Sequence, residues 1–426
     1  MVDQGYHWPD GDADGPTADG PRRAAVAVVG AGAAGLVAAT FAARGGRGAV
    51  LAFDGARRLG AKILVSGGGR CNVTHWRVTE RDFAGSTPAA IRKVLGRFPV
   101  ERTIAFFRDA GVEFYREPDT GKLFPVGDSA RSILDALLTT ARGAGVRLVH
   151  PAAVTALERT PLGFRLESAA GTMHAERVIL CTGGRSLPKS GSDGSGFLLA
   201  ESLGHSIAPP VVPALVPLVL PGEHWIRSLT GLALPCRFRL LSGSGKPVAE
   251  SVGSTLCTHT GLSGPATLDI SRHWLVSRDH DPAARLLLDW LPDVDGAALE
   301  ALLVGAGARG VLAALKPWLS ERLVRCLCAA ATAPPAGDLP RDARRRLVAV
   351  VKEMPLPVIG DRGWNVAEAT AGGVPLAEVR LDTMESRMCP GLHFAGEMLD
   401  VDGRIGGFNF QWAWASGFVA GSAAGG

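Results

Sequence analysis

The sequence predicts an α/β fold built on a parallel sheet, and three observations lead to that prediction. The segment 24–46, AAVAVVGAGAAGLVAATFAARGG, begins as a continuous apolar strand and passes through a glycine turn into an alanine-rich helix. A second apolar strand, GAVLAFDG, follows at 48–55. Strand, helix and strand within about 30 residues is the length of a parallel βαβ unit. After residue 365 the chain returns to strand and helix segments punctuated by glycine, so the opening unit and the C-terminal part are expected to share one sheet.

The segments between these two parts are predicted in order from their periodicity. Helical spacing appears twice between 90 and 149, and each of these segments ends at glycine, as helix C-termini often do. Short strands are expected over 146–180 and again, with many Pro and Gly, over 211–270. Residues 284–352 are rich in Leu, Ala and Arg at helical spacing. A chain that opens with a βαβ unit, leaves it and returns predicts one discontinuous domain with an insertion.

Composition places the chain among globular enzymes. With 426 residues it is long enough for two or three packed units, and 46% of them are hydrophobic against 20% charged. The formal net charge of +4 comes from scattered Arg rather than a basic tail, so nucleic-acid binding is not indicated. Residues 1–23, rich in Gly, Asp and Pro, are predicted to be a disordered leader. No run of about 18 apolar residues is evident, so no membrane span is expected.

The seven cysteines show no Cys-x-x-Cys pair, and the ten histidines form no His-Glu-x-x-His motif. We therefore expect free thiols in a reducing cytoplasm and no metal site.

The motif GAGAAG at 30–35 predicts a dinucleotide site. It follows a strand, opens a helix, and is followed by an acid, Asp54, at the end of the next strand. Gly30 permits a tight turn, Gly32 lets the backbone approach a pyrophosphate, and Gly35 allows helix and strand to pack closely. The helix N-terminus, with Ala33 and Ala34, offers free N–H groups and partial positive charge to phosphates, and Asp54 can accept hydrogen bonds from a ribose.

A second glycine-rich stretch, AKILVSGGGRCN, lies at 61–72. Its bare backbone N–H groups can approach the same dinucleotide. Arg70 could neutralise a pyrophosphate and Asn72 could bond ring or ribityl atoms. Cys71 has no partner cysteine four or five residues away, so it is interpreted as a packing residue rather than a nucleophile. The candidate residues of this stretch are Lys62, Ser66, Gly67, Gly69, Arg70, Cys71 and Asn72.

From about 24 to 422 the sequence resembles the bacterial family of NAD(P)/FAD-dependent oxidoreductases, the aminoacetone-oxidase-like FAD-binding proteins. The combination of SGGGRCN with HFAGEMLDVDGRIGGFNFQWAWASG at 393–417 is more discriminating than the first glycine motif, which many folds share. Two departures stand out. The central Ala-Thr-Gly-Gly of the family is Cys181-Thr182-Gly183-Gly184 here, and Thr74 is followed by His75 where the family often has Asn.

The resemblance implies a Rossmann-like FAD-binding domain over 24–195 and 363–426. It also implies an inserted β-barrel-like domain over 196–270 and 343–362, interrupted by a helical subdomain over 271–342. FAD is expected between the N-terminal and C-terminal motifs, with the final helix pointing its N-terminus at the N1/O2 side of the ring. The additional residues it places at the cofactor are Thr182, Gly183, Gly184, Gly396, Glu397, Asp400, Gly406, Gly407, Asn409 and Gln411.

The sequence therefore predicts a cytoplasmic FAD-dependent oxidoreductase acting on a small molecule. NAD(P)H, docking transiently because no second GxGxxG unit is found, or molecular oxygen would complete the redox cycle. The reaction could be dehydrogenation or oxidation of an amine or alcohol, or reduction of an activated C=C bond. Spacing singles out no catalytic acid or base, and it says nothing of oligomeric state. A flavoprotein acting on RNA and a flavin-binding sensor or assembly protein without turnover are the alternatives.

Overall fold

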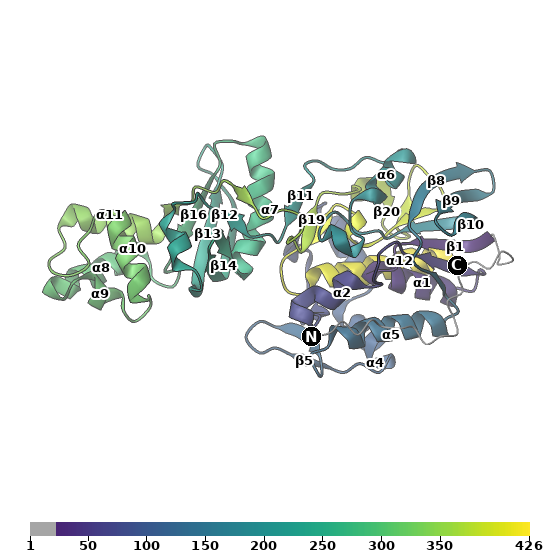
Figure 1. Ribbon diagram of the computed structural model, residues 1–426, viewed down its shortest axis with the longest axis horizontal. Coiled ribbons are helices and arrows are strands. Elements are labelled where there is room, and N and C mark those ends of the chain that lie inside the picture. Colours follow the sequence, from purple (N-terminus) through teal and green to yellow (C-terminus); the bar gives the residue numbers. More distant parts are fainter. Residues whose placement is uncertain (1–22) are drawn as a thin grey trace. The chain divides into compact units, whose positions relative to one another are not determined.

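A computed structural model describes residues 23–426, so the predicted leader lies outside the described residues apart from Arg23. The described chain forms two compact units, which we call the first unit (23–211 and 369–426) and the second unit (212–368) (Figure 1). The first unit is thus made of two separate chain segments with the second unit inserted between them. The sequence-based boundaries, after 195 and before 363, differ from these, because the helix and connection at 195–211 belong to the first unit.

The first unit is built on a nine-stranded sheet. Its central strands run in the order β22-β10-β1-β2-β7, and all their pairings are parallel. Antiparallel strands β21 and β20 extend the sheet beyond β22, and the β8–β9 hairpin pairs with the first half of β10, off the main strand order. The strands are β1 (Arg23–Val29), β2 (Val50–Phe53), β7 (Arg147–Val149), β8 (Val154–Thr160), β9 (Gly163–Ser168), β10 (Gly171–Leu180), β20 (Val379–Arg380), β21 (Glu385–Ser386) and β22 (Leu392–Phe394).

Helices and two small sheets complete the first unit. One small sheet has the order β3-β6-β5, and the other pairs β23 with β4. The helices are α1 (Ala33–Arg44), α2 (Ala61–Val65), α3 (Pro88–Leu95), α4 (Val100–Asp109), α5 (Ala130–Gly143), α6 (Ser195–Ser202) and α12 (Phe408–Gly425). The remaining strands are β3 (Thr74–His75), β4 (Phe83–Gly85), β5 (Phe114–Arg116), β6 (Lys122–Pro125), β19 (Ala369–Ala371) and β23 (Val401–Gly403).

Helices α1 and α12 lie side by side because one face of each carries almost no side chain (Figure 1). A Cβ added at Gly417, Gly421 or Gly425 of α12 would come within 2.6, 2.2 and 2.2 Å of the backbone oxygens of Ala34, Ala38 and Ala42 on α1. The four-residue spacing on both helices brings the two backbones together along their whole contact. This contact fixes α12, and with it the loop that precedes it, against the helix that follows GAGAAG.

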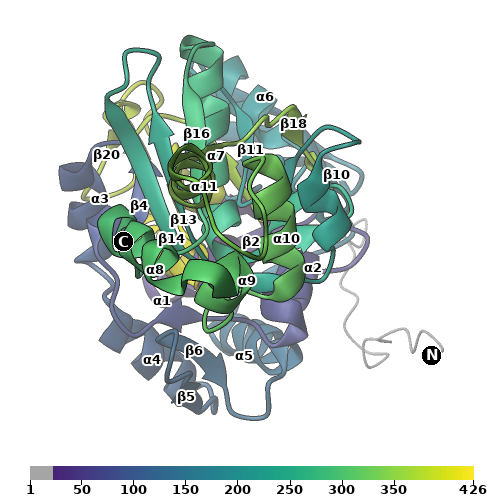
Figure 2. The ribbon, with the colours of Figure 1, turned by 90° about the vertical axis from the view of Figure 1, so that its left-hand side faces the viewer.

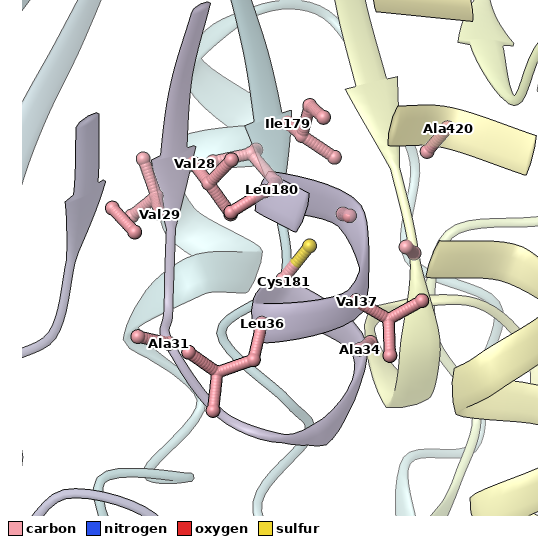
Figure 3. Close-up of a cluster of buried hydrophobic side chains, with 14 of the residues drawn as sticks. Val28, Val29, Ala31, Ala34, Leu36, Val37, Ile179, Leu180, Cys181 and Ala420 are labelled. Atoms are coloured by element: carbon pink, nitrogen blue, oxygen red, sulfur yellow. The ribbon is translucent and has the colours of Figure 1, made fainter. Parts of the chain in front are cut away.

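The core of the first unit is formed where α1 packs on β1 and β10 (Figure 3). Val28, Leu180 and Leu36 are fully buried there. The apolar residues that predicted a continuous strand at the start of the chain are the residues buried on both faces of the sheet, as expected for parallel strands covered by helices.

The second unit is a seven-stranded antiparallel sheet of order β17-β16-β13-β14-β15-β12-β18, with helix α7 packed on β13 and β14 and helices α8–α11 grouped together (Figure 2). Its elements are β11 (Val212–Ala214), β12 (Leu218–Val219), β13 (Ala233–Leu241), β14 (Pro247–Thr258), β15 (Gly261–Ser263), α7 (Pro265–His280), β16 (Arg285–Asp289), α8 (Gly296–Ala306), α9 (Gly310–Leu315), α10 (Glu321–Ala330), α11 (Arg341–Lys352), β17 (Met354–Pro355) and β18 (Gly360–Asp361).

The predicted separation into a barrel-like and a helical part differs from this arrangement. Strand β16 lies inside the segment 271–342 that was expected to be helical, and helix α11 continues into the segment expected to be barrel-like. Sheet and helices share one hydrophobic core, which includes Phe238, Trp290 and Leu323. The strand is short and highly apolar, so its periodicity alone does not distinguish it from buried helix.

Within the described residues, one segment, Gly296–Leu315, is long and apolar enough by length and composition to cross a membrane, with a mean hydropathy of 1.6. It includes the charged residues Glu300 and Arg309, so no unbroken apolar run marks it in the sequence. The segment is divided into α8 and α9, because Gly307 (φ 50°) and Gly310 (φ 75°) adopt left-handed conformations between them.

Candidate functional site

The candidate site lies at the carboxyl ends of three adjacent parallel strands. Strand β1 runs into the GAGAAG loop, β10 into Cys181–Gly184, and β22 into the loop that begins at Ala395. Because the strands are parallel, these three loops meet at one edge of the sheet. Open α/β sheets bind ligands at this edge.

The first loop has the geometry that the three glycines predict. At Gly30 (φ 96°) a Cβ would lie 2.5 Å from the carbonyl oxygen of Cys181, and at Gly35 it would lie 1.7 Å from the carbonyl oxygen of Gly30. Both positions are therefore closed by the protein itself. At Gly32, the residue before α1, a Cβ would meet nothing within 4 Å. The first turn of α1, with Ala33 and Ala34, has no side-chain cap, so this open space adjoins unpaired backbone N–H groups. A pyrophosphate fits that combination.

Asp54 connects the first loop to the end of β2. One carboxylate oxygen accepts a 2.8 Å hydrogen bond from the N–H of Ala31, and the other accepts a 2.8 Å bond from the N–H of Ala56. Burial raises the pKa of Asp54 above its ordinary value, although these two hydrogen bonds and the nearby His150 oppose the shift. Each oxygen retains acceptor capacity, so Asp54 can hold the loop and also accept from a ribose hydroxyl.

The second glycine stretch forms a short turn, Ser66–Gly69, in which Gly67 and Gly69 have positive φ. Ser66 closes it, because its carbonyl oxygen accepts from the N–H of Cys71 at 3.1 Å. The Cys71 side chain is fully buried, and burial raises its pKa to about 12. A thiol held protonated in this way is a poor nucleophile, in agreement with its interpretation as a packing residue.

Arg70 is held by residues of a neighbouring segment. Its guanidinium stacks over the ring of Phe124 at 4.0 Å and pairs with Glu117 at 3.5 Å. Both partners belong to the segment that forms β5, β6 and their connection. The predicted role of Arg70 at a pyrophosphate stays a prediction.

Asn72 carries a buried polar atom that has no partner in the described chain. Its side chain is 8% exposed, and its Oδ1 makes no hydrogen bond. A Cβ added at Gly407, the residue before α12, would lie 2.8 Å from this oxygen. A buried acceptor of this kind calls for a donor from outside the chain. Asn72 therefore fits the predicted contact with a flavin, since a flavin carries N–H and hydroxyl donors.

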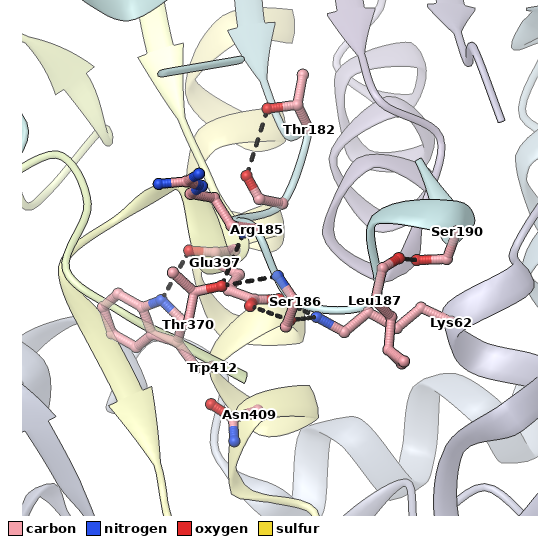
Figure 4. Close-up of polar contacts among 12 residues, drawn as sticks. Lys62, Thr182, Arg185, Ser186, Leu187, Ser190, Thr370, Glu397, Asn409 and Trp412 are labelled. Atoms are coloured by element: carbon pink, nitrogen blue, oxygen red, sulfur yellow. Dashed lines mark hydrogen bonds and ion pairs between the residues drawn. The ribbon is translucent and has the colours of Figure 1, made fainter. Parts of the chain in front are cut away.

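A polar cluster joins α2, the loop after β10 and the loop after β22 (Figure 4). Lys62 forms an ion pair with Glu397 and donates to Oγ of Ser186 at 2.5 Å, and Ser186 donates to Glu397 at 2.8 Å. The backbone N–H groups of Arg185 and Ser186 donate to Oγ1 of Thr370, at 2.8 and 3.1 Å. Lys62 and Glu397, which are 335 positions apart in the sequence, are thus in direct contact.

The loop after β10 is tightly packed beside this cluster. The Thr182 hydroxyl contacts the sulfur of Met398. A Cβ at Gly183 would lie 2.8 Å from Oγ of Ser192, and one at Gly184 would lie 2.4 Å from Oγ1 of Thr370. These glycines are needed for the close approach of neighbouring protein segments.

Gly396 lies against the start of α1 and is held from two sides by α12. Its N–H donates to Ser416 at 2.9 Å, and its carbonyl accepts from the indole of Trp412 at 3.1 Å. A Cβ at Gly396 would lie 2.8 Å from that of Ala34. The C-terminal motif is therefore brought to the N-terminal one, as expected for a ligand that spans both.

Other residues of the C-terminal motif make close contacts with neighbouring segments of the protein. A Cβ at Gly407 would lie 2.6 Å from the backbone of Thr74, and one at Gly406 would lie 3.1 Å from the ring of Phe408. Asn409 exchanges two hydrogen bonds with the backbone of Gly403, at 2.8 and 2.9 Å. Protein atoms thus occupy the space that a Cβ would need at both glycines, and the predicted contact of this segment with the cofactor stays a prediction.

Gln411 and Asp400, two further residues predicted at the cofactor, also make hydrogen bonds within the protein. The Gln411 amide is 1% exposed, accepts from Thr74 at 2.7 Å and Thr103 at 3.0 Å, and donates to the carbonyl of Phe98 at 2.8 Å. The backbone of Asp400 accepts from the N–H of Ser86 at 2.8 Å. Gln411 fastens α12 to β3, and Asp400 fixes the strand that follows.

Sequence reasoning missed Ser186, Thr370 and Ser416. Each is a serine or threonine with no distinctive spacing, and each acts through a contact with a residue far away in the chain. No group of three or more His, Cys, Asp or Glu side chains that could hold a metal is found among residues 23–426.

Comparison with known proteins agrees with this geometry. The family model described as HI0933-like protein Rossmann domain matches residues 24–423. A 3-dehydro-bile acid delta(4,6)-reductase of Clostridium scindens is 33% identical over 407 residues, covering 94% of this chain and 98% of that protein. A ribosomal RNA dihydrouridine synthase of Escherichia coli is 33% identical over 400 residues, covering 92% and 96%.

A solved structure shares the fold at low identity. The 3-ketosteroid delta1-dehydrogenase of Sterolibacterium denitrificans has a TM-score of 0.51 and 13% identity, and the match covers 95% of this chain and 99% of that one. The chain therefore belongs to the HI0933-like Rossmann-domain family, and it is an FAD-dependent oxidoreductase, as its glycine motifs predict.

Proposed function

We propose that this protein reduces a carbon–carbon double bond that is conjugated with a carbonyl group, using electrons that NADH or NADPH delivers to FAD. The observation that carries the proposal is the shared chemistry of two relatives, each 33% identical to this chain over more than nine-tenths of its length. One name describes reduction of double bonds in a 3-oxo bile acid, and the other describes conversion of uridine to dihydrouridine. Both reactions saturate a C=C bond that a neighbouring carbonyl makes electron-poor.

The site supports this chemistry by the way it would hold the cofactor. FAD, when bound, supplies a two-electron donor for transfer of hydride to the electron-poor carbon. The open space at Gly32 and the N-terminus of α1 would receive the pyrophosphate, and Asp54 would accept from the ribose. Lys62 pairs with Glu397 of the C-terminal motif, and both side chains are partly exposed. The N-terminus of α12, beside Asn72, favours negative charge.

Reduction of the double bond also requires one proton, which is added to the carbon that does not receive the hydride. The thiol of Cys71 is not its source in this proposal, because a buried thiol with a pKa of about 12 lies beneath the loop surface. The proton comes instead from solvent, so that hydride and proton together add two hydrogen atoms to the substrate.

The test is an anaerobic half-reaction followed by a screen of acceptors. NADH or NADPH should bleach the flavin absorbance, and a conjugated enone should restore it with product that has gained two hydrogen atoms by mass spectrometry. A saturated ketone of the same skeleton is the matched control and should leave the flavin reduced. Reoxidation by oxygen alone, with no enone turned over, would contradict the proposal and favour an oxidase.

The second candidate is reduction of uracil within RNA, and the name of the Escherichia coli relative favours it. The two candidates differ in the acceptor, so the screen should include a 4-en-3-one bile acid, free uridine and an unmodified ribosomal RNA fragment. Reoxidation by RNA but not by the bile acid would select the second candidate. The net charge of +4 is too small and too scattered to decide between them.

A further inference from the structure

Lys62, Ser186 and Glu397 form a closed ring of hydrogen bonds, which we call the Lys–Ser–Glu ring (Figure 4). The Lys62 ammonium donates to both of the others, and the Ser186 hydroxyl accepts from lysine and donates to glutamate. The Ser186 side chain is fully buried, whereas the side chains of Lys62 and Glu397 are 29% and 19% exposed. The serine is therefore the inner member, and the two charged groups are the outer ones.

The position of Ser186 is fixed by its own backbone. Its N–H donates to Oγ1 of Thr370, which is 1% exposed, and the N–H of Arg185 donates to the same oxygen. Gly184 packs directly against the Thr370 side chain. The hydroxyl is thus held on a segment with little freedom to move, while Lys62 has a long side chain on the short helix α2.

The Lys–Ser–Glu ring leaves some hydrogen-bond donors and acceptors unused. An ammonium has three donors, and two of them are used within the ring. Each carboxylate oxygen of Glu397 accepts one bond and retains capacity for another. The outer face therefore presents one charged donor next to one charged acceptor, with the charges balanced. This arrangement suits a ligand segment in which an anionic phosphate adjoins hydroxyl groups.

We infer that Ser186 is a positioning residue for FAD, which orients Lys62 toward a phosphate and Glu397 toward a neighbouring hydroxyl of the ribityl chain. The inference rests on FAD as the cofactor and not on the identity of the substrate. Ser186 acts through the two charged side chains and does not itself touch the ligand. Without the Ser186 hydroxyl, Lys62 and Glu397 keep their charges but lose the hydrogen bonds that fix their orientation.

The ring predicts that the three residues act as a unit. Removing one charge leaves the other partly buried without its partner, which is more damaging than replacing both together. The effect of Ser186→Ala should therefore depend on whether the pair is present. Residues in one hydrogen-bond network show such non-additivity, and independent sites do not.

The experiment measures the FAD dissociation constant of the full-length apoprotein by quenching of flavin fluorescence. Ser186→Ala should weaken FAD binding about tenfold, the loss expected for a hydrogen bond to a charged group. Ser190→Ala is the matched control, because Ser190 lies on the same loop and its hydroxyl donates to a backbone carbonyl, that of Leu187, at 2.7 Å. This control should change the constant less than about twofold.

The deciding measurement repeats Ser186→Ala in the Lys62→Met/Glu397→Gln background. We expect Ser186→Ala to cause no tenfold loss of FAD affinity in that background. We also expect the Lys62→Met/Glu397→Gln variant to bind FAD better than Lys62→Met alone. The same factor in both backgrounds would overturn the inference, because the hydroxyl would then have a merely structural role. If Ser186→Ala does not fold, additive effects of Lys62→Met and Glu397→Gln would overturn it equally. A wild-type protein that binds no FAD would overturn the cofactor assignment itself.

Discussion

Asp54, at the end of β2, combines a structural role with the proposed role in binding FAD. It accepts hydrogen bonds from the N–H groups of Ala31 and Ala56, and it retains lone pairs for a ribose. Asp54→Ala should weaken FAD binding by about 1.5–3 kcal/mol for the lost charged acceptor. Asp54→Asn keeps one oxygen acceptor and should lose less. Equilibrium titration of the apoproteins with FAD measures both, and equal affinity in all three proteins would show that Asp54 is not at the ribose.

The pKa of Asp54 gives this prediction a pH dependence. Burial raises the pKa above its ordinary value of 3.8, so the native protein binds this proton more readily than the unfolded chain does. The stability that the group contributes is present below the unfolded pKa and is lost as the pH rises through the folded pKa. FAD binding through the ionised carboxylate should change in the opposite direction over the same window. Asp54→Asn should remove both dependences, as pH titrations of melting temperature and affinity would show.

Cysteine reactivity provides a second test at this scale. Among the seven cysteines, all within the described residues, six are buried and Cys326 is half-buried. Alkylation of the native protein at neutral pH should therefore label Cys326 first, and Cys326→Ser should remove that label. Cys71→Ser should retain FAD and most activity, because the Cys71 thiol is buried and protonated. A Cys71→Ser protein that holds FAD but is inactive would show that the thiol takes part in the reaction.

At the scale of elements, the N-terminus of α12 is the feature expected to tune the cofactor. Gly407 precedes the helix without a side-chain cap, and the unpaired Oδ1 of Asn72 lies beside it. Asn72→Asp would place a carboxylate near a helix N-terminus, which offsets part of the cost of burying the charge in the apoprotein. The same charge opposes the negative charge that a flavin gains on reduction. The reduction potential should therefore fall by about 30 mV, equivalent to about 1.4 kcal/mol for two electrons.

Two readouts of this variant separate a redox effect from a folding defect. Thermal melting of the apoprotein gives the first, and redox titration against a reference dye gives the second. Asn365→Asp makes the same change at an exposed position of the second unit and serves as the control. An unchanged potential at full FAD occupancy would mean that Asn72 and the N-terminus of α12 are not at the redox-active ring.

The contact between α1 and α12 makes a prediction about packing. At Gly421 a Cβ would lie 2.2 Å from the carbonyl oxygen of Ala38, so Gly421→Leu must push the helices apart. Overpacking of this kind costs about 1–3 kcal/mol, and it should also weaken FAD binding because α12 holds Gly396 in place. Ser422→Leu introduces the same side chain at the next, exposed position. Denaturant unfolding and FAD titration should show little change for that control.

At the scale of the whole molecule, the two units have separate hydrophobic cores. The chain leaves and re-enters the first unit at neighbouring points, since Ala208 donates to the carbonyl of Gly373 at 2.8 Å and a Cβ at Gly372 would lie 3.2 Å from the Cα of Val211. A short Gly/Ser linker replacing 212–368 should therefore leave a folded first unit that binds FAD within about tenfold of the full chain. Loss of FAD binding in a folded first unit would show that the second unit contributes to the cofactor site.

The sequence by itself determined the parallel βαβ start, the discontinuous arrangement of the domain and the family. These follow from local information. An apolar strand, a glycine turn and a helix lie next to one another in the chain, so the separate roles of Gly30, Gly32 and Gly35 follow from their order and spacing alone. Lys62 and Glu397 are predicted at the cofactor from their motifs, but nothing in the sequence indicates that they contact each other.

Only the tertiary structure decided which candidates face an open site and which are used within the protein. Gln411 and Asn409 match a family motif, yet their amides bond to Thr74 and to Gly403. Ser186 has no motif of its own and lies at the centre of the Lys–Ser–Glu ring. The physical reason is that a buried polar side chain takes its hydrogen-bond partners from the segments that tertiary packing places beside it. Strands that are neighbours in the sheet, such as β10 and β22, come from distant parts of the chain.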